Sequence, residues 1–221
     1  MTELIFLGAS TAFYEVDEIV YAINKISPTY KFIGILDDNP VVQGTYLREI
    51  PVVGTLTDAE KFPHVKFVFG IGSMKTRLIR DQILAKTGLA ASAFESIIHP
   101  SVVIDRTAKI GNGCIFHPGV CVGNDAIIEP FTIIAVNSAI APYVKIGEFS
   151  MITSLALVLT GSELGRMCFI GSHSIITENV KVGEKSMVGV GTIVSRNIDK
   201  GVFVLGNPMR VISKTTINEE L

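Results

Sequence analysis

The chain has few charged residues and no long apolar run. Of its 221 residues, 18% are charged and 48% are hydrophobic, and the formal net charge is −2. No run of about eighteen apolar residues occurs, because Asn137 and Pro142 interrupt the most hydrophobic segment, so we expect no membrane insertion. No basic segment precedes the first apolar residues, which argues against a secretory signal. The small net charge gives no reason to expect a nucleic-acid partner.

Cysteine is also scarce. Cys114, Cys121 and Cys168 are the three cysteines of the chain. Their odd number and their spacing fit neither a disulfide framework nor a metal site, so we expect reduced cysteines and no bound metal. Reduced cysteines are typical of a cytoplasmic protein, which is the location we predict.

The chain is instead rich in a six-residue repeat. An aliphatic or aromatic residue recurs at every sixth position without a break in phase, and a small or β-branched residue precedes each by two positions. The large residues of the repeat are Ile98, Ile104, Ile110, Phe116, Val122, Ile128, Ile134, Ile140, Ile146, Ile152, Val158, Leu164, Ile170, Ile176, Val182, Val188 and Val194. Because helices repeat near 3.6 residues and strands near 2, neither produces this period. The repeat predicts a parallel β-helix with both kinds of residue turned inward.

A glycine often follows the large residue of the repeat. These glycines are Gly111, Gly123, Gly147, Gly165, Gly171, Gly183 and Gly189. Because glycine adopts backbone angles that other residues resist, we expect these positions to form the corners of the coils.

Many outward positions of the predicted β-helix are apolar as well, and the mean hydropathy of the chain is +0.47. A monomer would expose this surface, so we expect a packed oligomer. Hexapeptide β-helices usually associate around an axis parallel to the helix, and we predict a homotrimer of this kind.

The first 95 residues lack the sixfold pattern. We expect strands at residues 3–7, 31–36, 51–56 and 66–69 and helices at 14–25 and 74–86. Alternating strands and helices predict a small parallel sheet of the dinucleotide-binding type. The predicted organisation is thus an α/β domain at 1–95, a β-helix domain at 96–212 and a C-terminal tail at 213–221.

Glycines and acidic residues follow the predicted parallel strands. Gly8, the pair Asp37 and Asp38, and the segment from Gly70 to Gly72 all fall at carboxyl ends of strands, where such sheets bind ligands. A helix N-terminus after Gly8 would offer N–H groups to a phosphate. The full G-x-G-x-x-G fingerprint is missing, however, and a turn glycine beside a solvated aspartate pair explains these residues equally well.

Several longer segments carry a family resemblance over nearly the whole chain. They read, in order, LIFLGAS, GILDDNP, IPVVGTL, FGIGSMKTR, IIHPS, the hexapeptide array and GVFVLGNPMRVI. In these segments the chain resembles the PglD/NeuD-type sugar acyltransferases of bacteria, which acetylate nucleotide-linked amino sugars or sialic acid. The resemblance implies a Rossmann-like N-terminal domain that binds a nucleotide-sugar and a left-handed parallel β-helix that binds acetyl-CoA or another acyl-CoA. It also implies active sites between trimer subunits.

The resemblance assigns two sets of binding residues. The set implied for the nucleotide-sugar comprises Gly8, Ala9 and Ser10 near the phosphates, Asp37 and Asp38 near the base or ribose, and Gly70 and Gly72 as pocket lining. The set implied for acyl-CoA comprises Gly171, Gly189 and Gly191 beside the channel, and Asn207, Pro208 and Arg210 towards the nucleotide end.

The family's catalytic pair is absent from the matching positions. In the family, a histidine that removes a proton from the acceptor and a neighbouring acidic residue precede an I-G-[DE]-F segment. Here the segment runs from Ile146 to Phe149, and the two positions hold Pro142 and Tyr143. Proline neither accepts nor donates a proton, so the general base is unknown.

Three other side chains are candidates for the base. His117 and His173 lie in the β-helix, and Tyr143 follows Pro142. We expect residues 18 apart to stack, and by this rule neither histidine shares the column of Pro142. Tyr143 has an ordinary pKa near 10, which is too high for a base at neutral pH. Outward surface or interface roles are the better explanation for all three.

The leading interpretation is an acyl-CoA-dependent N-acyltransferase that acts on a nucleotide-linked amino sugar in surface glycan or polysaccharide biosynthesis. Orientation alone supplies much of the rate of such a reaction, and an amine depends on a base less than a hydroxyl does. Two alternatives stay open. One is a catalytically silent homologue that binds a nucleotide-sugar or serves as a regulatory or structural subunit, and the other is a sugar O-acyltransferase with a relocated base.

Overall fold

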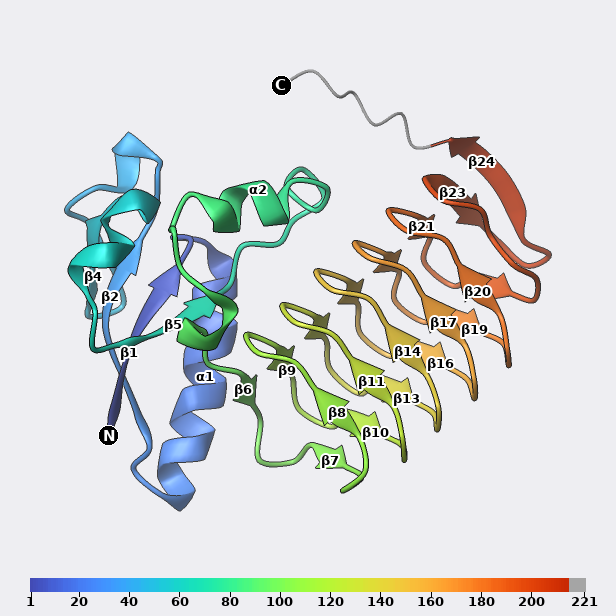
Figure 1. Cartoon of the computed structure of the whole chain (residues 1–221), viewed down its shortest axis with the longest axis horizontal. Coiled ribbons are helices and arrows are strands. Elements are labelled where there is room, and N and C mark those ends of the chain that lie inside the picture. Colours follow the sequence, from blue (N-terminus) through green and yellow to red (C-terminus); the bar gives the residue numbers. More distant parts are fainter. Residues whose placement is uncertain (215–221) are drawn as a thin grey trace. The chain divides into compact units, whose positions relative to one another are not determined.

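The computed structural model describes residues 1–214, and the chain forms two compact units, Met1–Pro100 and Ser101–Leu221 (Figure 1). The boundary lies close to the one expected between residues 95 and 96. Residues 213 and 214, expected in the tail, belong to the last strand, β24 (Arg210–Lys214). Residues 215–221 of the expected tail lie outside the described residues.

The first unit contains a mainly parallel sheet. Its elements are β1 (Thr2–Leu7), α1 (Thr11–Ile26), β2 (Tyr30–Leu36), η1 (Pro40–Val42), β3 (Tyr46–Leu47), β4 (Ile50–Gly54), η2 (Leu56–Lys61), β5 (Lys66–Phe69), α2 (Arg80–Ala85), η3 (Ala91–Ala93) and β6 (Ile97–Ile98). The strand order is β3-β4-β2-β1-β5, with β4, β2, β1 and β5 parallel and β3 antiparallel to β4. The chain therefore leaves β1 on one side and returns at β5 on the other, which creates a switch point in the strand order between β1 and β5.

Apolar side chains of β1 and α1 form the core of this unit. Residues 4–7 of β1 are fully buried, and α1 buries Phe13, Val16 and Ile19 along one face. The ring of Phe13 packs edge-on against Phe6 and Phe32, with centroid distances of 5.4 Å in both cases. This packing fixes the N-terminus of α1 beside the end of β1.

The second helix is much shorter than the sequence predicts. The apolar spacing at residues 74–86 predicts a helix, but α2 spans only Arg80–Ala85. In the preceding segment, the hydroxyls of Ser73 and Thr76 bond each other, and each accepts a backbone N–H of the other residue. Such local side-chain bonds offer the backbone an alternative to a helical turn, which explains the later start of the helix.

The second unit is a parallel β-helix, as the repeat predicts. Its two-residue strands are β7 (Val103–Ile104), β8 (Lys109–Ile110), β9 (Ile115–Phe116), β10 (Cys121–Val122), β11 (Ile127–Ile128), β12 (Ile133–Ile134), β13 (Ala139–Ile140), β14 (Lys145–Ile146), β15 (Met151–Ile152), β16 (Leu157–Val158), β17 (Glu163–Leu164), β18 (Phe169–Ile170), β19 (Ile175–Ile176), β20 (Lys181–Val182), β21 (Met187–Val188) and β22 (Ile193–Val194). Each strand pairs with the strand three positions along the chain, so that Ile133 lies beside Met151 and Ile134 beside Ile152. Successive coils therefore stack eighteen residues apart (Figure 1).

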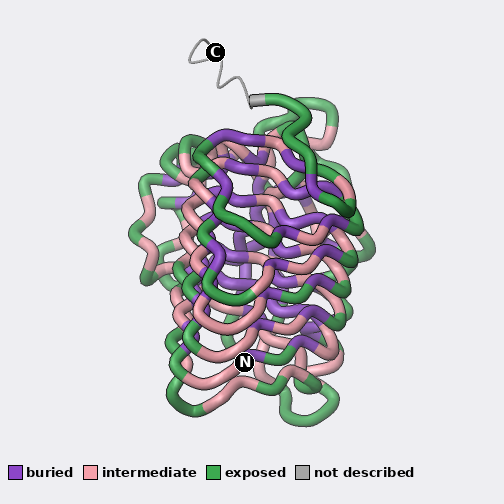
Figure 2. Tube along the Cα trace, turned by 90° about the vertical axis from the view of Figure 1, so that its right-hand side faces the viewer, coloured by how far each residue is buried: buried purple, intermediate pink, exposed green. Residues whose placement is uncertain are grey.

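Three flat sheets form the walls of the β-helix. The first has the order β22-β19-β16-β13-β10-β7 and the second β20-β17-β14-β11-β8. The third runs β21-β18-β15-β12-β9 and is extended by β23 (Val202–Leu205), which carries β24 as an antiparallel edge. Buried positions recur in the same places from coil to coil (Figure 2).

The inward columns of the β-helix contain the residues that the repeat predicts. From Phe116 to Val194 every large residue of the repeat is buried, whereas Ile104 and Ile110 in the first coil are half-buried. The small inward positions include serines that bond one coil to the next. Ser138 donates its hydroxyl to the carbonyl of Thr153 at 2.9 Å and accepts the N–H of Ala156 at 3.3 Å. The buried hydroxyls thus hold neighbouring coils together.

The expected role of the repeat glycines is wrong. None of the seven has a positive φ; the left-handed residues lie instead three positions before the large inward residues. These residues are Gly113, Gly119, Asp125, Phe131, Asn137, Tyr143, Phe149, Leu155, Gly161, Met167, His173, Asn179, Lys185 and Gly191. The repeat glycines are required by close approach: a Cβ on Gly165 would lie 2.5 Å from the backbone nitrogen of Glu184 in the next coil.

Among the described residues, no helix is both long and apolar enough to cross a membrane.

Candidate functional site

A pocket of about 480 Å³ lies at the carboxyl edge of the parallel sheet in the first unit. It is lined by Gly8, Ser10, Thr11, Ala12, Asp37, Asp38, Leu56, Ile71, Gly72, Ser73, Thr76, Ile79, Ile83 and Lys86. The ends of β1, β2 and β5 meet here because the three strands are parallel neighbours. The structure therefore brings together Gly8, Ser10, Asp37, Asp38 and Gly72, as the sequence predicts.

The loop after β1 is held by bonds within the protein. The N–H of Gly8 donates to the carbonyl of Leu36 at 2.9 Å, and that of Ala9 donates to Oδ2 of Asp37 at 2.6 Å. The N–H of Ser10 donates to the carbonyl of Gly8 at 2.9 Å. These three N–H groups are thus engaged, and the backbone N–H groups left for a ligand belong to the next residues.

Those next residues form the N-terminus of α1. Thr11 and Ala12 line the pocket, and N–H groups of a first helical turn have no acceptor within the helix. The first turn of α1 contains no acidic residue. Because the helix dipole places partial positive charge at this end, the site favours an anionic group such as a phosphate.

The two aspartates after β2 differ in their surroundings. Asp37 accepts the N–H of Ala9 on one oxygen and the N–H of Asn39, at 2.7 Å, on the other. Asp38 accepts the N–H of Leu56 at 2.9 Å and the Nζ of Lys86 at 2.8 Å. Partial burial raises the pKa of Asp38, but the bonds from Lys86 and Leu56 outweigh this effect and lower the pKa below its ordinary value. Asp38 is therefore ionised at neutral pH.

Two of the residues that the resemblance assigns to the nucleotide-sugar do not line the pocket. Gly70 is buried, and a Cβ there would lie 1.8 Å from Cζ of Phe6, so this glycine is required by the ring. Ala9 contributes its N–H to Asp37 and supports the loop. The apolar wall formed by Leu56, Ile71, Ile79 and Ile83, together with Lys86, was not predicted from the sequence.

The positions of the family's catalytic pair lie at a corner of the β-helix between β13 and β14. Pro142 is half-buried, and its carbonyl accepts the N–H of Gly161 at 3.1 Å. Tyr143 has a φ of 61° and its side chain is exposed. Residues Asn124 and Thr160 precede and follow Pro142 in its column, one coil away in each direction. Neither is a general base at neutral pH.

The two candidate histidines lie at a different corner from Pro142. His173, between β18 and β19, is exposed and has a φ of 58°. His117 follows β9, and only 9% of it is exposed, so of the two roles expected for it the surface role is wrong and the interface role stays a prediction. The repeat determines the direction in which its Cβ leaves the coil, but not what covers the side chain. Within one chain, therefore, the structure does not bring either histidine to Pro142.

The residues assigned to acyl-CoA lie near the C-terminal end of the β-helix. Gly171 and Gly189 are buried, and Gly191 is exposed with a φ of 67°. A Cβ on Gly189 would lie 2.4 Å from Cδ1 of Leu205, so the last coil packs closely on β23. Asn207 and Pro208 are exposed in the β23–β24 connection, and Arg210, the first residue of β24, is exposed as well.

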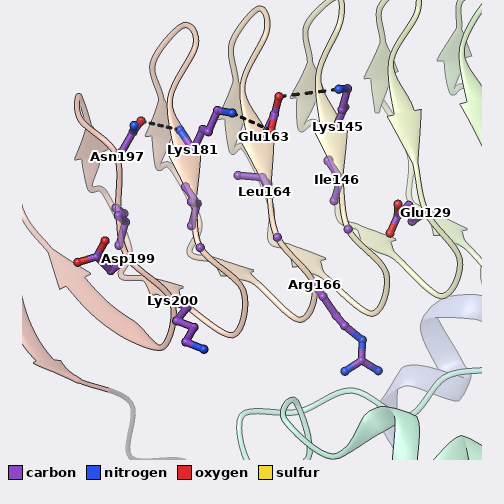
Figure 3. Close-up of a pocket in the computed structure, with 15 residues that line it drawn as sticks. Glu129, Lys145, Ile146, Glu163, Leu164, Arg166, Lys181, Asn197, Asp199 and Lys200 are labelled. Carbon is purple, nitrogen blue, oxygen red and sulfur yellow. Dashed lines mark hydrogen bonds and ion pairs between the residues drawn. The ribbon is translucent and has the colours of Figure 1, made fainter.

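A second groove, of about 520 Å³, runs along the sheet that contains β14, β17 and β20 (Figure 3). Glu163 lies between Lys145 and Lys181, with N–O distances of 3.8 and 3.4 Å. Arg166 donates to Glu148 at 2.6 Å. Exposed ion pairs of this kind contribute about 0–1 kcal/mol each. Because acidic and basic groups alternate here, the groove has no strong preference for a charged ligand.

The described part of the chain contains no group of three or more histidine, cysteine or acidic residues that could hold a metal ion.

Comparisons with known proteins define the fold. A family model described as the GMPPB C-terminal domain matches residues 98–202. No match was found among the curated proteins. The structure of PerB from Caulobacter crescentus, in complex with CoA and GDP-perosamine, is 20% identical, with a TM-score of 0.84 over 96% of this chain and 98% of that chain. The acetyltransferase domain of PglB from Neisseria gonorrhoeae is 24% identical, with a TM-score of 0.83 over 96% and 100%.

A third similar structure aligns over a shorter range. AntD, an N-acyltransferase from Bacillus cereus in complex with dTDP and 3-hydroxybutyryl-CoA, is 21% identical, with a TM-score of 0.51 over 54% of this chain and 79% of that chain. The coarser part of the expected fold is thus confirmed: the chain has the fold of PerB and of the PglB acetyltransferase domain, an α/β unit followed in sequence by a parallel β-helix of hexapeptide repeats.

Proposed function

We propose that the protein is an acyl-CoA-dependent N-acyltransferase that acts on a nucleotide-linked amino sugar, in cytoplasmic steps of surface glycan or polysaccharide biosynthesis. One observation carries the proposal: the pocket at the strand ends contains the predicted residues Gly8, Ser10, Asp37, Asp38 and Gly72, in a chain that aligns with the CoA- and GDP-perosamine-bound PerB over 96% of its length. The α/β unit is then a Rossmann-like domain for the nucleotide.

In this proposal, the α/β pocket binds the nucleotide part of the acceptor. The phosphates lie at the N-terminus of α1, near Thr11 and Ala12. The apolar wall, including Leu56 and Ile83, packs against the base. Acyl-CoA lies along the corner that contains Gly171, Gly189 and Gly191, and the active unit is a homotrimer.

The proposed trimer is supported by an apolar face of the β-helix. The sheet that contains β7, β10 and β16 carries Val103, which is 64% exposed, and Leu157, which is 37% exposed. Packing this face against neighbouring copies removes apolar surface from water. Light scattering tests the assembly, and a monomer at micromolar concentration contradicts it.

The transfer step is the attack of the sugar amine on the thioester carbonyl. A C–N bond forms, the C–S bond breaks, and CoA leaves as a thiolate. The proton lost by nitrogen passes to solvent or to this thiolate, because Pro142 supplies no base at the family's position. A general base contributes about 10²–10⁴-fold, so we expect slow turnover that relies on positioning of the two substrates.

The test is thiol release from acetyl-CoA in the presence of UDP-, dTDP- and GDP-linked amino sugars. The proposal predicts release with at least one amino sugar and none with the matching hydroxyl sugar. The rate should rise with pH as the amine loses its proton, without a second ionisation near the ordinary histidine pKa of about 6.5.

Pro142 also favours a second candidate, a catalytically silent homologue that binds a nucleotide-sugar as a regulatory or structural subunit. The same panel separates the two candidates. Nucleotide-sugar binding with no thiol release supports the silent homologue and contradicts the transferase.

A further inference from the structure

The pocket of the α/β unit contains two carboxylates and one cation. Asp37 and Asp38 line it, and Lys86 is the only lysine or arginine among its described lining residues. A nucleoside diphosphate would bring further negative charge to this site. Without a cation, the two aspartates would repel the phosphates, since like charges a few ångströms apart oppose binding.

Lys86 is placed to change partners. Its Nζ lies 2.8 Å from Oδ2 of Asp38, but the side chain of Lys86 is 54% exposed and that of Asp38 37%. Ion pairs at such exposed sites are worth about 0–1 kcal/mol, so separating this one costs little. The lysine stem has four rotatable carbon–carbon bonds and carries a compact charge that tolerates many geometries.

Asp38 does not depend on Lys86 to stay in place. Its other oxygen accepts the N–H of Leu56 at 2.9 Å. Asp37 is held independently by the N–H groups of Ala9 and Asn39. The acidic side of the pocket therefore keeps its shape when the ammonium group moves away.

We propose that Lys86 is the residue that selects for the diphosphate: on nucleotide binding it exchanges Asp38 for a phosphate oxygen. The inference rests on the proposed function of the pocket. It assigns the two charges separate roles, with Lys86 bonded to the phosphates and Asp38 left to face the nucleoside.

The experiment is isothermal titration of the full-length protein with UDP, GDP, dTDP and inorganic pyrophosphate. Lys86→Met should weaken the tightest nucleotide and pyrophosphate by about tenfold or more, the loss typical of a hydrogen bond to a charged group. It should also reduce the dependence of affinity on salt. Lys86→Arg should restore most of the affinity because it keeps the charge.

Asp38→Asn distinguishes this exchange from a structural role of the ion pair. If Lys86 changes partners, the variant should bind pyrophosphate as tightly as the wild type or up to about fivefold more tightly, because the competing partner is gone. If Lys86 only holds Asp38 in place, Asp38→Asn and Lys86→Met should weaken pyrophosphate binding alike, which overturns the proposal.

A matched control is Lys61→Met. Lys61 forms an exposed ion pair with Asp58 in the same unit but does not line the pocket. The Lys61→Met protein should therefore bind the nucleotides and pyrophosphate as tightly as the wild type. Unchanged nucleotide affinity in Lys86→Met would overturn this inference while leaving the proposed function intact. A wild-type protein that binds none of the three nucleotides would refute the proposed function and this inference together.

Discussion

Asp37 is expected to hold the loop after β1 in place, and its replacement by asparagine tests this role. The carboxylate accepts the N–H of Ala9 at 2.6 Å and that of Asn39 at 2.7 Å. Asparagine keeps one acceptor oxygen and turns a donor NH₂ towards the other N–H. A hydrogen bond to a charged group is worth about 1.5–3 kcal/mol, and the half-buried position reduces this, so we expect a loss of about 1–2 kcal/mol in the free energy of unfolding.

Urea unfolding followed by near-ultraviolet circular dichroism measures this loss. The chain contains no tryptophan, and four of its five tyrosines, Tyr14, Tyr21, Tyr30 and Tyr46, lie in the α/β unit, so the signal reports mainly on this unit. Nucleotide affinity should fall together with stability, because Ala9 and its neighbours lose their anchor. Asp58→Asn is the matched control: Asp58 bonds the N–H of Thr55 outside the pocket, so only stability should change. If Asp37→Asn loses nucleotide affinity at unchanged stability, Asp37 contacts the ligand directly and the anchoring role is refuted.

Three further variants test other parts of the structure. Gly165→Ala should lower the free energy of unfolding by about 1–3 kcal/mol, because the new Cβ would lie 2.5 Å from the nitrogen of Glu184. Ala135→Gly, at the same repeat position, is the control. A Gly165→Ala protein as stable as the wild type contradicts the close approach. Burial, and then the hydrogen bond and charge of Glu95, raise the pKa of Tyr30 to about 12, so its contribution to stability is complete below the ordinary value of about 10 and is lost as pH rises through 12. The absorbance of tyrosinate should show a tyrosine that loses its proton only near pH 12, and this step should be absent in Tyr30→Phe. If the step remains in Tyr30→Phe, it belongs to another tyrosine. Pro142→His should add an ionisation near pH 6.5 to the rate profile and raise thiol release by up to about 10²–10⁴-fold. Pro142→Ala should do neither, and identical rates in the two variants would show that this corner is not the site of transfer.

The sequence predicts the β-helix well because its period is a direct consequence of the coil geometry. Each large residue that the repeat places inward from Phe116 to Val194 is buried. The left-handed corners were missed, because residues as bulky as Phe131, Leu155 and Met167 share these positions with glycine, asparagine and aspartate, so residue type marks only some of them. The reason for the repeat glycines was missed as well: Gly165 meets Glu184, a contact that exists only after the coils have stacked.

In the α/β unit, the pocket was predicted because carboxyl ends of parallel strands converge wherever such a sheet forms. The detailed partners were not. Asp37 reaches Ala9 and Lys86 reaches Asp38 across 28 and 48 residues of sequence, and nothing local marks these pairs. The shortened second helix has a local cause, the bonds between Ser73 and Thr76, which compete with an apolar spacing that favours a helix.

The stacking of coils also restricts how the length of this protein can change. Ile133 pairs with Met151 and Met151 with Phe169, so eighteen residues return the chain to the same wall. Removing one complete coil would preserve every inward and outward position downstream, together with the serine bonds between coils. Removing a single six-residue repeat would also keep the inward residues inside, but it would rotate everything downstream by one wall of the prism. Removing such a repeat between Tyr143, which lies between β13 and β14, and Gly171, which lies between β18 and β19, would change the directions in which these two corners face relative to each other. The β-helix can therefore lengthen or shorten by whole coils, whereas changes by thirds of a coil would rearrange its surface features.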